Sequence, residues 1–566
     1  MTYRAPSADH EFILRHVVNV AQVAATDRYA EATPETVAAI LTEAARLCDD
    51  VLAPVNRNGD LTPARLENGV VRSSPGFAEA YRAIAAGGWV GLSASPDHGG
   101  MGLPMAVATA VNEMMSGACL SLQLKPLLSQ GQIEALEHHA SDELKALYLP
   151  KLISGEWAGT MNLTEPQAGS DVGALRTRAE PRGDGTYAVT GQKIFITWGD
   201  CDITANHCHL VLARLPDAAP GTRGISLFMV PKFLPDAAGN PGARNSLKVV
   251  SLEHKLGIHG SPTCVMQFDG ATGWLVGAEN RGMAAMFTMM NNARLGVGAQ
   301  GVGLAEAALQ KAVAFAQDRV QGATAEGVPG IIGHADVRRM LAEARAEVFA
   351  ARAIAAACAV AIDMGNATGD AAWAARAALL TPIAKAFGTE TGCRVADAGV
   401  QVHGGMGFIE ETGAAQFLRD ARITPIYEGT NGIQAMDLVG RKLADGGEAA
   451  FRLIGEIEAG AQAARPALPE LAEALWSAAE SLRETTEALL ALSPDDRFAG
   501  AVPYLRAFAL VLGAGFHLTA AQADAARLPL ARVMILRLLP DHAPLLARAL
   551  LGAEALYALS PEALAG

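Results

Sequence analysis

The chain has 566 residues, of which 50% are apolar and 18% are charged, and its formal net charge is −14. This length exceeds what one compact core can organise, and the composition is typical of folded rather than disordered proteins. The acidic balance argues against a nucleic-acid or anionic-membrane partner, because such partners favour a basic surface.

Hydrophobic periodicity and turn signals predict a mostly α-helical protein with a central β-domain. Near the start of the chain, Thr33-Pro34 is typical of a helix N-cap and first turn. Further along, Asp184-Gly185 between two β-rich runs is typical of a hairpin turn. The order helix, sheet, helix, helix excludes a doubly wound α/β fold. The predicted domains are an N-terminal helical domain at 1–157, a middle β-domain at 158–278, a helical-bundle domain at 279–445 and an added helical domain at 446–566.

Targeting and cysteine signals predict a cytoplasmic protein. The seven cysteines are odd in number and contain no Cys-x-x-Cys pair, which favours free thiols in a reducing compartment. The opening MTYRAPSADHEF lacks the basic-then-apolar pattern of a signal peptide. Residues 507–523 carry no charge, but the stretch is too short and too polar for a membrane span, so it predicts a buried helix.

Three short motifs suggest sites that their surroundings do not support. GVGAQG at 296–301 matches the dinucleotide fingerprint, but a Met-rich helical run precedes it instead of a strand, which favours close helix packing. HGGMG occurs at 98–102 and 403–407 without a GxSxG nucleophile elbow, so turns between helices explain both copies, and a phosphate-facing role stays open for the second. His207-Cys208-His209 would place its cysteine on the opposite face of a strand from the histidines, so we predict no metal site.

Two loops near the β-domain carry groups that suit a flat cofactor. LTEPQAGSD at 163–171 combines hydroxyl groups with a Pro-turned backbone, which suits a heteroaromatic ring edge or a phosphate; a plain interdomain turn is the alternative. KIFITWGD at 193–200 places Thr197 between Phe195 and Trp198. These side chains could line a flat cofactor or fill the core of a sheet.

An isolated acid, Glu428, lies in TPIYEGTNGIQ at 424–434, just before a Gly-Thr-Asn-Gly turn. Together with LTEPQAGSD, KIFITWGD, Arg294 with its GVGLA helix and QVHGGMGF, this stretch resembles the acyl-CoA dehydrogenase family in order and spacing. The resemblance covers roughly residues 35–443. The additional C-terminal domain is similar to that of the enlarged subgroup that includes 3-methylthiopropanoyl-CoA dehydrogenases. The resemblance implies a helical domain, a β-barrel-like domain and a four-helix bundle, with FAD held between them.

The resemblance also implies individual roles. Glu428 is the expected base for the α proton of an acyl-CoA thioester, with FAD as the hydride acceptor. A free glutamate has a pKa of about 4.3, so we expect burial to raise it toward the working range. The implied FAD-binding residues are Thr164, Ser170, Phe195, Thr197, Arg319, Gln401, Gly405 and Thr430. The implied acyl-CoA-binding residues are Ser170, Arg294, Tyr427 and Gly429. Three of the FAD residues would serve a neighbouring subunit, so a homodimer is expected.

The implied function is FAD-dependent oxidation of an acyl-CoA to the 2-enoyl-CoA in fatty acid metabolism, with electrons passed to electron-transfer flavoprotein. An acyl-CoA oxidase would differ only in whether oxygen reaches the reduced flavin, which the sequence does not distinguish. A DNA-associated flavoprotein of the alkylation-response type would need a basic added domain. Residues 448–566 instead carry nine Arg, no Lys and fourteen acids. The acyl chain, the physiological electron acceptor and the choice between dimer and tetramer are not defined by the sequence.

Overall fold

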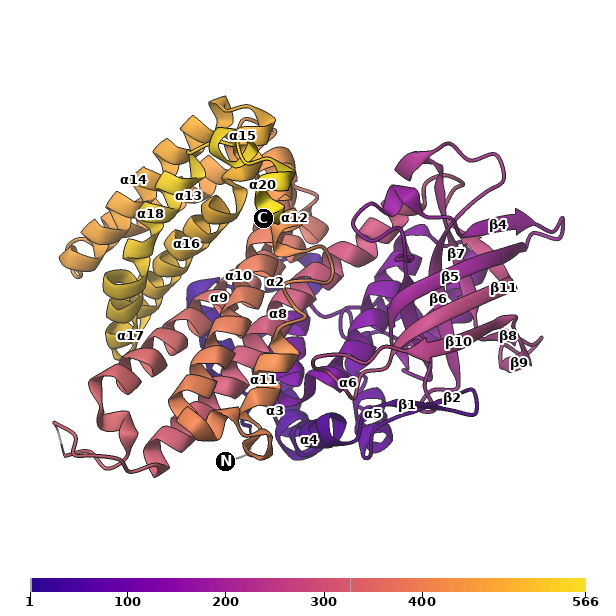
Figure 1. The fold of residues 1–566 in the computed structure, drawn as a ribbon, viewed down its shortest axis with the longest axis horizontal. Helices are drawn as coiled ribbons and strands as arrows, with labels where there is room; N and C mark the ends of the chain where they lie inside the picture. The colour runs from indigo at the N-terminus through magenta and orange to yellow at the C-terminus, as the bar shows by residue number, and fades with distance from the viewer. Residues whose placement is uncertain (1–2, 326) are drawn as a thin grey trace. The chain divides into compact units, whose positions relative to one another are not determined.

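The computed structural model describes residues 3–325 and 327–566, and the chain forms two compact units (Figure 1). Unit 1 contains the chain up to Ala45 together with Pro104–Gly117 and Arg294–Gly566, whereas unit 2 contains Arg46–Leu103 and Ala118–Ala293. The units therefore interleave along the sequence: the predicted range 1–157 is divided between them.

A seven-stranded sheet forms the β-part of unit 2, with helices such as α5 (Phe77–Ala86) and α6 (Met105–His139) beside it (Figure 1). Its order is β10-β11-β5-β4-β6-β3, and β7 pairs with both β11 and β6. The predicted hairpin is confirmed, because Asp184 lies between β4 and β5 and its carboxylate accepts a hydrogen bond from the Thr186 N–H at 2.9 Å. The strands are β3 Trp157–Asn162, β4 Arg178–Pro181, β5 Tyr187–Thr197, β6 Asn206–Arg214, β7 Ile225–Pro231, β10 Leu247–Leu252 and β11 Thr263–Val276.

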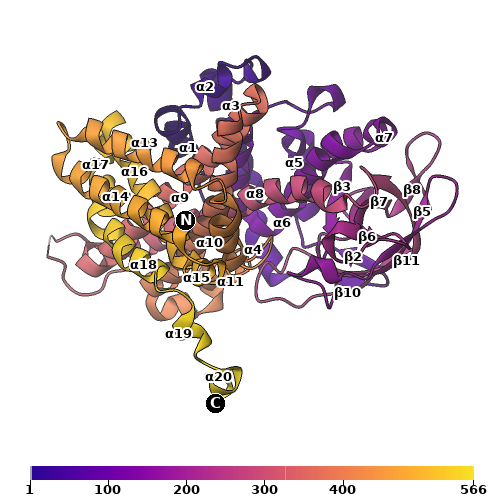
Figure 2. The same ribbon diagram turned by 90° about the horizontal axis from the view of Figure 1, so that it is seen from above.

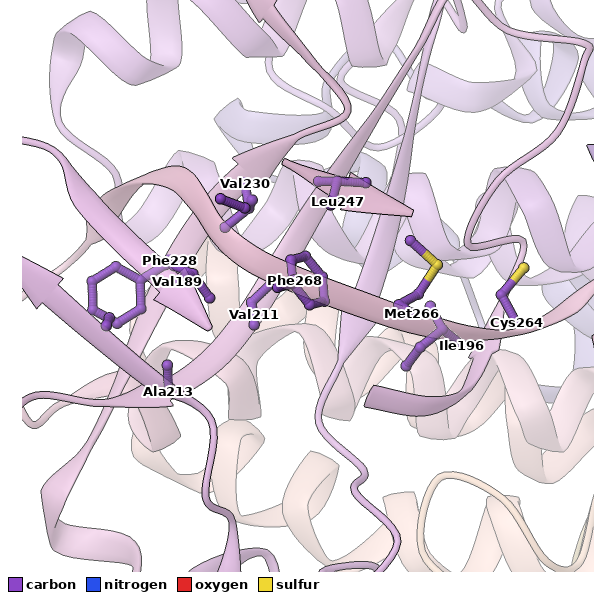
Figure 3. Packing of buried hydrophobic residues seen from close by; sticks show 12 residues of the cluster. Val189, Ile196, Val211, Ala213, Phe228, Val230, Leu247, Cys264, Met266 and Phe268 are labelled. Carbon is purple, nitrogen blue, oxygen red and sulfur yellow. The ribbon is translucent and has the colours of Figure 1, made fainter. Parts of the chain in front are cut away.

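The apolar core of this sheet comes from side chains that face each other across the strands (Figure 3). Val189, Val211, Phe228 and Phe268 are fully buried. Strand β7 is buried along its whole length, which accounts for its nearly continuous apolar sequence. Burial of such side chains supplies the main stabilisation of the unit.

The remaining elements of unit 2 are two small sheets and several helices. Helix α7 has a serine N-cap: it starts after Ser141, whose hydroxyl accepts a hydrogen bond from the Leu144 N–H. The small sheets pair β1 Arg65–Glu67 with β2 Val70–Arg72 and β8 Phe233–Pro235 with β9 Pro241–Arg244. The helices are α4 Ala53–Leu61, α5 Phe77–Ala86 and α7 Asp142–Ile153. Two long helices, α6 Met105–His139 and α8 Gly282–Asp318, contribute residues to both units.

Long helices form a bundle in unit 1, and small residues let two of them approach closely. A Cβ atom at Gly298 on α8 would lie 2.8 Å from the Ala384 carbonyl oxygen on α10, and one at Gly301 would lie 2.4 Å from that of Gly388. The interpretation of GVGAQG as a packing motif within a helix is therefore confirmed. The other helices of this part are α1 Ser7–Phe12, α2 Ala21–Ala24, α3 Pro34–Leu47, α9 Ala335–Thr368, α10 Ala371–His403, α11 Ala414–Ala421 and α12 Asn431–Asp437. As predicted, α3 begins at Pro34 and the Thr33 hydroxyl accepts from the Thr36 N–H.

A buried group of charges connects three helices of unit 1. The Arg352 guanidinium on α9 lies 2.7 Å from Glu113 Oε1 on α6 and 3.0 Å from Glu306 Oε2 on α8, and all three side chains are at most 2% exposed. Burial would raise the pKa of Glu306, but Arg352 and Arg345 outweigh it and lower the pKa to about 2. The ionised glutamate therefore stabilises the folded state.

The added C-terminal domain lies in unit 1 and packs on the bundle (Figures 1 and 2). Its central helix α16 contacts α9, where Gly513 lies against Ala350 and His517 Nε2 lies 2.9 Å from the Ala346 carbonyl oxygen. By length and composition alone, α6, α9 and α16 could each cross a membrane. The argument that residues 507–523 are too short and too polar for a span is therefore wrong, because the helix begins earlier, at Ala501, and is apolar enough over its full length. In the fold, 72% of an apolar 18-residue stretch of α16 is buried, in agreement with the predicted buried helix at 507–523. The helices are α13 Glu448–Ala464, α14 Pro469–Ala491, α15 Pro494–Ala499, α16 Ala501–Ala523, α17 Leu528–Val533, α18 His542–Ala549, α19 Glu554–Tyr557 and α20 Pro561–Ala565.

Candidate active site

The loop that carries Glu428 lies between α11 and α12 in unit 1 and has an unusual backbone. Glu428 and Gly429 both adopt left-handed conformations, with φ of +54° and +81°. Left-handed backbone is unfavourable for a glutamate, so surrounding contacts must hold it in place. Two of them are local: the Asn431 N–H donates to the Pro425 carbonyl at 3.0 Å, and the Thr430 hydroxyl caps α12 by accepting from the Ile433 N–H.

Two buried side chains also hold the carbonyl groups of this loop. Gln434 Nε2 donates to the carbonyl oxygens of Glu428 and Gly429 at 3.3 and 3.4 Å. Lys385 Nζ on α10 donates to the Gly429 carbonyl at 2.9 Å and to Asn431 Oδ1 at 3.0 Å. The Gly-Thr-Asn-Gly turn, which has a flexible sequence, is therefore fixed by hydrogen bonds from side chains of α10 and α12.

The environment of Glu428 gives its carboxyl the properties of a base. Burial raises its pKa to about 7, and the positive charges of Arg294 and Lys385 act in the opposite direction. The residue as a whole is half-buried, so the protein surrounds it without closing it off completely. A carboxyl that is poised between its two protonation states near neutral pH suits proton abstraction.

The structure brings several predicted residues close to Glu428. Arg294 is 6% exposed, and its Nη1 lies 4.0 Å from Asp437 Oδ2. Glu428 is among the charges that raise the pKa of Arg294 against the lowering effect of burial. The Tyr427 hydroxyl donates to Gln300 Oε1 on α8 at 2.5 Å, so this group anchors the loop to the bundle. Thr430 and Gly429 form the turn itself.

Three other predicted residues lie at the opposite end of the bundle. Arg294 and Asp318 are 24 residues apart on α8, which corresponds to about 36 Å of helix. Arg319 follows directly and is exposed, as are Gln401 and Gly405 where α10 ends. The Phe315 and His403 rings stack at 4.4 Å, which places the ends of α8 and α10 side by side. These predicted cofactor residues therefore form a group of their own.

A further predicted group surrounds the end of β5 in unit 2. Opposite Val265 of β11, this strand has two residues, Ile194 and Phe195, which is the pattern of a β-bulge. Phe195 has φ of +61°, and the residue is 59% exposed. The Ile194 N–H donates to the Thr164 carbonyl at 2.9 Å, so the LTEPQAGSD loop lies beside the bulge. Thr197 is half-buried two residues further on, and Ser170 is exposed.

A buried ion pair fixes this loop. The Lys193 side chain is fully buried, and its Nζ donates to the Leu163 carbonyl at 2.9 Å and to Glu165 Oε1 at 2.8 Å. Burial would raise the pKa of Glu165, but the Lys193 charge outweighs it and lowers the pKa to about 2. The hydroxyl-bearing loop and the exposed ring are thus held in one rigid arrangement.

Comparison with known proteins assigns this arrangement to a family. Acyl-CoA dehydrogenase models match in chain order: the N-terminal domain at residues 34–156, the middle domain at 160–271 and the C-terminal domain at 280–443. A model described as acetyl-CoA dehydrogenase C-terminal like matches residues 453–559. The 3-methylmercaptopropionyl-CoA dehydrogenase of Ruegeria pomeroyi is 49% identical over 89% of this chain and 88% of its own. The chain belongs to the acyl-CoA dehydrogenase family.

A further relative supports this assignment, and a solved structure shows the same fold. A butyryl-CoA dehydrogenase of Syntrophomonas wolfei is 38% identical over 70% of this chain and 68% of its own. The crystal structure of an acyl-CoA dehydrogenase from Bacillus anthracis, complexed with FAD, has the same fold with a TM-score of 0.75. It is 20% identical and covers 94% of this chain and 89% of its own. The predicted fold, with an added C-terminal helical domain, is confirmed.

Acyl-CoA dehydrogenases use FAD, and the residues of this chain fit that cofactor. The exposed Phe195 ring offers an apolar face to a flat ring system, and the neighbouring Thr164 loop offers hydroxyl and N–H groups to its edge. At the far end of the bundle, a Cβ atom at Gly404 or Gly405 would meet no atom within 4 Å, so a bound group could approach the backbone there. The exposed Arg319 guanidinium suits a diphosphate.

The predicted absence of a metal site at His207-Cys208-His209 can be compared with the surroundings of His207, which is buried in β6. His207 Nε2 lies 3.3 Å from Cys201 Sγ, and Lys125 Nζ lies 3.4 Å from the same sulfur. Burial lowers the pKa of His207 well below its usual value. Within residues 3–325 and 327–566, no group of three or more His, Cys, Asp and Glu is placed to hold a metal ion. The seven cysteines all lie in this part of the chain and are free thiols, as predicted.

Sequence reasoning missed the side chains that position these loops. Lys385 and Gln434 beneath Glu428, and Lys193 with Glu165 beneath the LTEPQAGSD loop, were not among the candidates. One signal was available: Glu165 lies in LTEPQAGSD and Lys193 in KIFITWGD. Lys385 occurs in an ordinary helical stretch, where a lysine usually indicates a solvated face.

Proposed function

We propose that Glu428 is the base that removes the α proton of an acyl-CoA thioester. The observation that carries this proposal is the Glu428 carboxyl itself, which burial gives a pKa of about 7 on a loop held by four hydrogen bonds from Lys385 and Gln434. A base of this strength is about half ionised near neutral pH. FAD, when bound, supplies the acceptor for the hydride that leaves the β carbon.

The residues around Glu428 would then have two roles: they would adjust the pKa of its carboxyl and hold its loop in place. The positive charge of Arg294 opposes the effect of burial on the carboxyl and favours its ionised form. After proton transfer the carboxyl is neutral, so the same burial that raised its pKa stabilises it. Tyr427 and Gln300 hold the loop against α8 and prevent it from drifting away from the substrate.

We propose a short acyl-CoA as the substrate, with 3-methylmercaptopropionyl-CoA as the first candidate. The 49% identity with the enzyme of that name across nearly the whole chain supports this choice. The 38% identity with a butyryl-CoA dehydrogenase makes butyryl-CoA the closest alternative. Both are short thioesters, and the two differ by one sulfur atom and its added length.

The proposed electron acceptor is electron-transfer flavoprotein, and the proposed assembly is a homodimer. The dimer is supported by the distance of about 36 Å along α8 between Arg294 and the Arg319 end of the bundle. One extended cofactor beside Glu428 does not reach that far within the same chain, so the exposed residues at the far end would serve the FAD of a second copy.

The test is anaerobic mixing of FAD-loaded protein with a panel of acyl-CoA thioesters of increasing length. Fast loss of the oxidised flavin spectrum is expected with 3-methylmercaptopropionyl-CoA and butyryl-CoA, and slow loss with long chains. Flavin reduction by long chains alone would contradict the proposed substrate. Fast reoxidation by oxygen in the absence of electron-transfer flavoprotein would instead indicate an oxidase.

A further inference from the structure

A lysine buried beneath the Glu428 loop combines hydrogen bonds to that loop with a positive charge. Lys385 is fully buried in the middle of α10. Two of its three N–H groups are accounted for, by the Gly429 carbonyl at 2.9 Å and by Asn431 Oδ1 at 3.0 Å. Asn431 is itself held by the Thr389 hydroxyl and the Ala386 carbonyl of α10. The lysine is therefore built into the support of the loop.

A buried ammonium group is costly, so this position demands an explanation. A neutral side chain of similar length could fill the same space, and Gln434 shows that an amide can donate to the same Gly429 carbonyl. What an amide cannot provide is charge. Burial lowers the pKa of Lys385 to about 7, and the neighbouring Glu428 is the largest influence that raises it. The two groups therefore titrate in the same pH range and influence each other.

The other charges that act on this pair come from the elements packed around it. Arg294 on α8 opposes protonation of Lys385, and Glu390 on α10 favours it. Asp437 on α12 and Arg441 just after it act on Arg294. Arg294 keeps its charge at every accessible pH, so Lys385 is the cation of this group that can change state near neutrality.

We propose that Lys385 is a positioning residue for Glu428 that acts through its positive charge as well as its hydrogen bonds, and keeps the base ionised at neutral pH. This inference rests on the proposed function of Glu428. Lys385 donates to the carbonyl of Gly429, the residue that follows Glu428. The backbone therefore holds the ammonium group of the lysine at a fixed position relative to Glu428. When Glu428 takes up a proton, the lysine loses its counter-charge and its own proton becomes easier to release.

Variants of Lys385 and Gln434 separate the effect of the lysine's charge from the effect of its hydrogen bonds. Lys385→Met removes both, whereas Gln434→Met removes hydrogen bonds to the same loop carbonyls without changing any charge. Lys385→Gln keeps a donor in place and removes only the charge, so it also serves if Lys385→Met does not fold. Each variant is made alone and in combination with Glu428→Gln.

The first readout does not depend on catalysis. Infrared difference spectra between each FAD-loaded protein and the same protein carrying Glu428→Gln isolate the carboxyl band, and its pH titration gives the midpoint of Glu428. The second readout is the pH at which anaerobic flavin reduction by butyryl-CoA is half-maximal. Both midpoints should rise by about one pH unit in Lys385→Met and Lys385→Gln, which leaves roughly tenfold less ionised base below the midpoint. Gln434→Met should slow reduction without moving either midpoint.

An unchanged infrared midpoint in both lysine variants would overturn the inference, since the lysine would then act only as a hydrogen-bonding support. Equal shifts in Gln434→Met and Lys385→Met would overturn it too, because loop distortion would explain both. If the infrared midpoint moves while Glu428→Gln reduces flavin at the normal rate, the influence of Lys385 on Glu428 is supported and the proposed base is wrong.

Discussion

Replacing Glu428 by glutamine removes basicity while it preserves the size and shape of the side chain. Burial raises the pKa of this carboxyl to about 7 from an ordinary value of 4.5. On that basis about one tenth of the wild-type protein is ionised at pH 6 and about nine tenths at pH 8. Wild-type flavin reduction should therefore rise about tenfold over this range. A bound acyl chain would bury the carboxyl further, so the midpoint with saturating substrate should lie at or above 7.

The glutamine variant should lack this pH dependence and should be slow at every pH. Loss of a general base typically costs 10²–10⁴-fold, and we expect at least the upper end, because the amide that replaces the carboxyl has no basicity. The assay is anaerobic stopped-flow measurement of the flavin spectrum between pH 5 and 9. FAD content and acyl-CoA binding should match the wild type, since the amide occupies the same space. Glu480→Gln, an exposed position on α14, is the matched control and should reduce flavin normally.

Two results would refute this reasoning. A glutamine variant that reduces flavin within tenfold of the wild-type rate would show that the base lies elsewhere. A wild-type rate that stays constant between pH 6 and 8 would show that the ionisation of Glu428 does not limit proton abstraction. A loss of activity that is accompanied by loss of FAD would be a folding effect and would have to be separated by measuring both in the same sample.

Further predictions concern the cofactor, the buried charges and the added domain. Arg319→Ala should weaken FAD retention, measured by released flavin, more than acyl-CoA affinity, because its guanidinium would pair with diphosphate; the reverse pattern would contradict its assignment. Arg352→Met should cost about 3–5 kcal/mol in denaturant unfolding, because it leaves Glu113 and Glu306 buried without a counter-charge. The contribution of Glu306, with a folded pKa of about 2, should be complete above its ordinary value and lost as the pH falls toward 2. Deleting residues 446–566 should expose the apolar face of α9 and cause aggregation visible by light scattering; a soluble truncated protein would contradict this.

The main features of the fold could be predicted from local sequence alone. Helix starts such as Thr33-Pro34 and the Asp184-Gly185 hairpin depend on neighbouring residues, so a local pattern is sufficient to identify them. The compact units could not be predicted, because α8 runs from one unit into the other as a single helix, and α6 does so across a kink at Cys119 that no Gly or Pro at that position indicates. Domains predicted as continuous residue ranges therefore give the order of the elements along the chain, but not which elements pack together in each unit.

In the candidate site, too, local motifs could be identified from the sequence, whereas contacts between distant residues could not. Glu428 and Phe195 lie in motifs with unusual composition, so they attract attention in the sequence. The bulge that turns the Phe195 ring outward depends on the register between β5 and β11, which no local pattern specifies. Lys385 occupies an ordinary helical position, and only the packing of α10 beneath the loop reveals its contacts.

The setting of Glu428 explains why a base would be placed on a turn rather than on a helix. A helical glutamate would share its face with the side chains one turn away along the helix. The turn instead presents the carboxyl at the tip of two left-handed residues, a conformation that costs of order 1–3 kcal/mol for a non-glycine residue. Hydrogen bonds from Lys385 and Gln434 to the loop carbonyls hold that conformation. Since each of these donors is buried, any relaxation of the turn would leave a donor unsatisfied, and the unfavourable backbone is the lower-energy choice. The rigidity of the loop thus comes from the residues beneath it, and its small polar sequence is what allows them to reach its backbone.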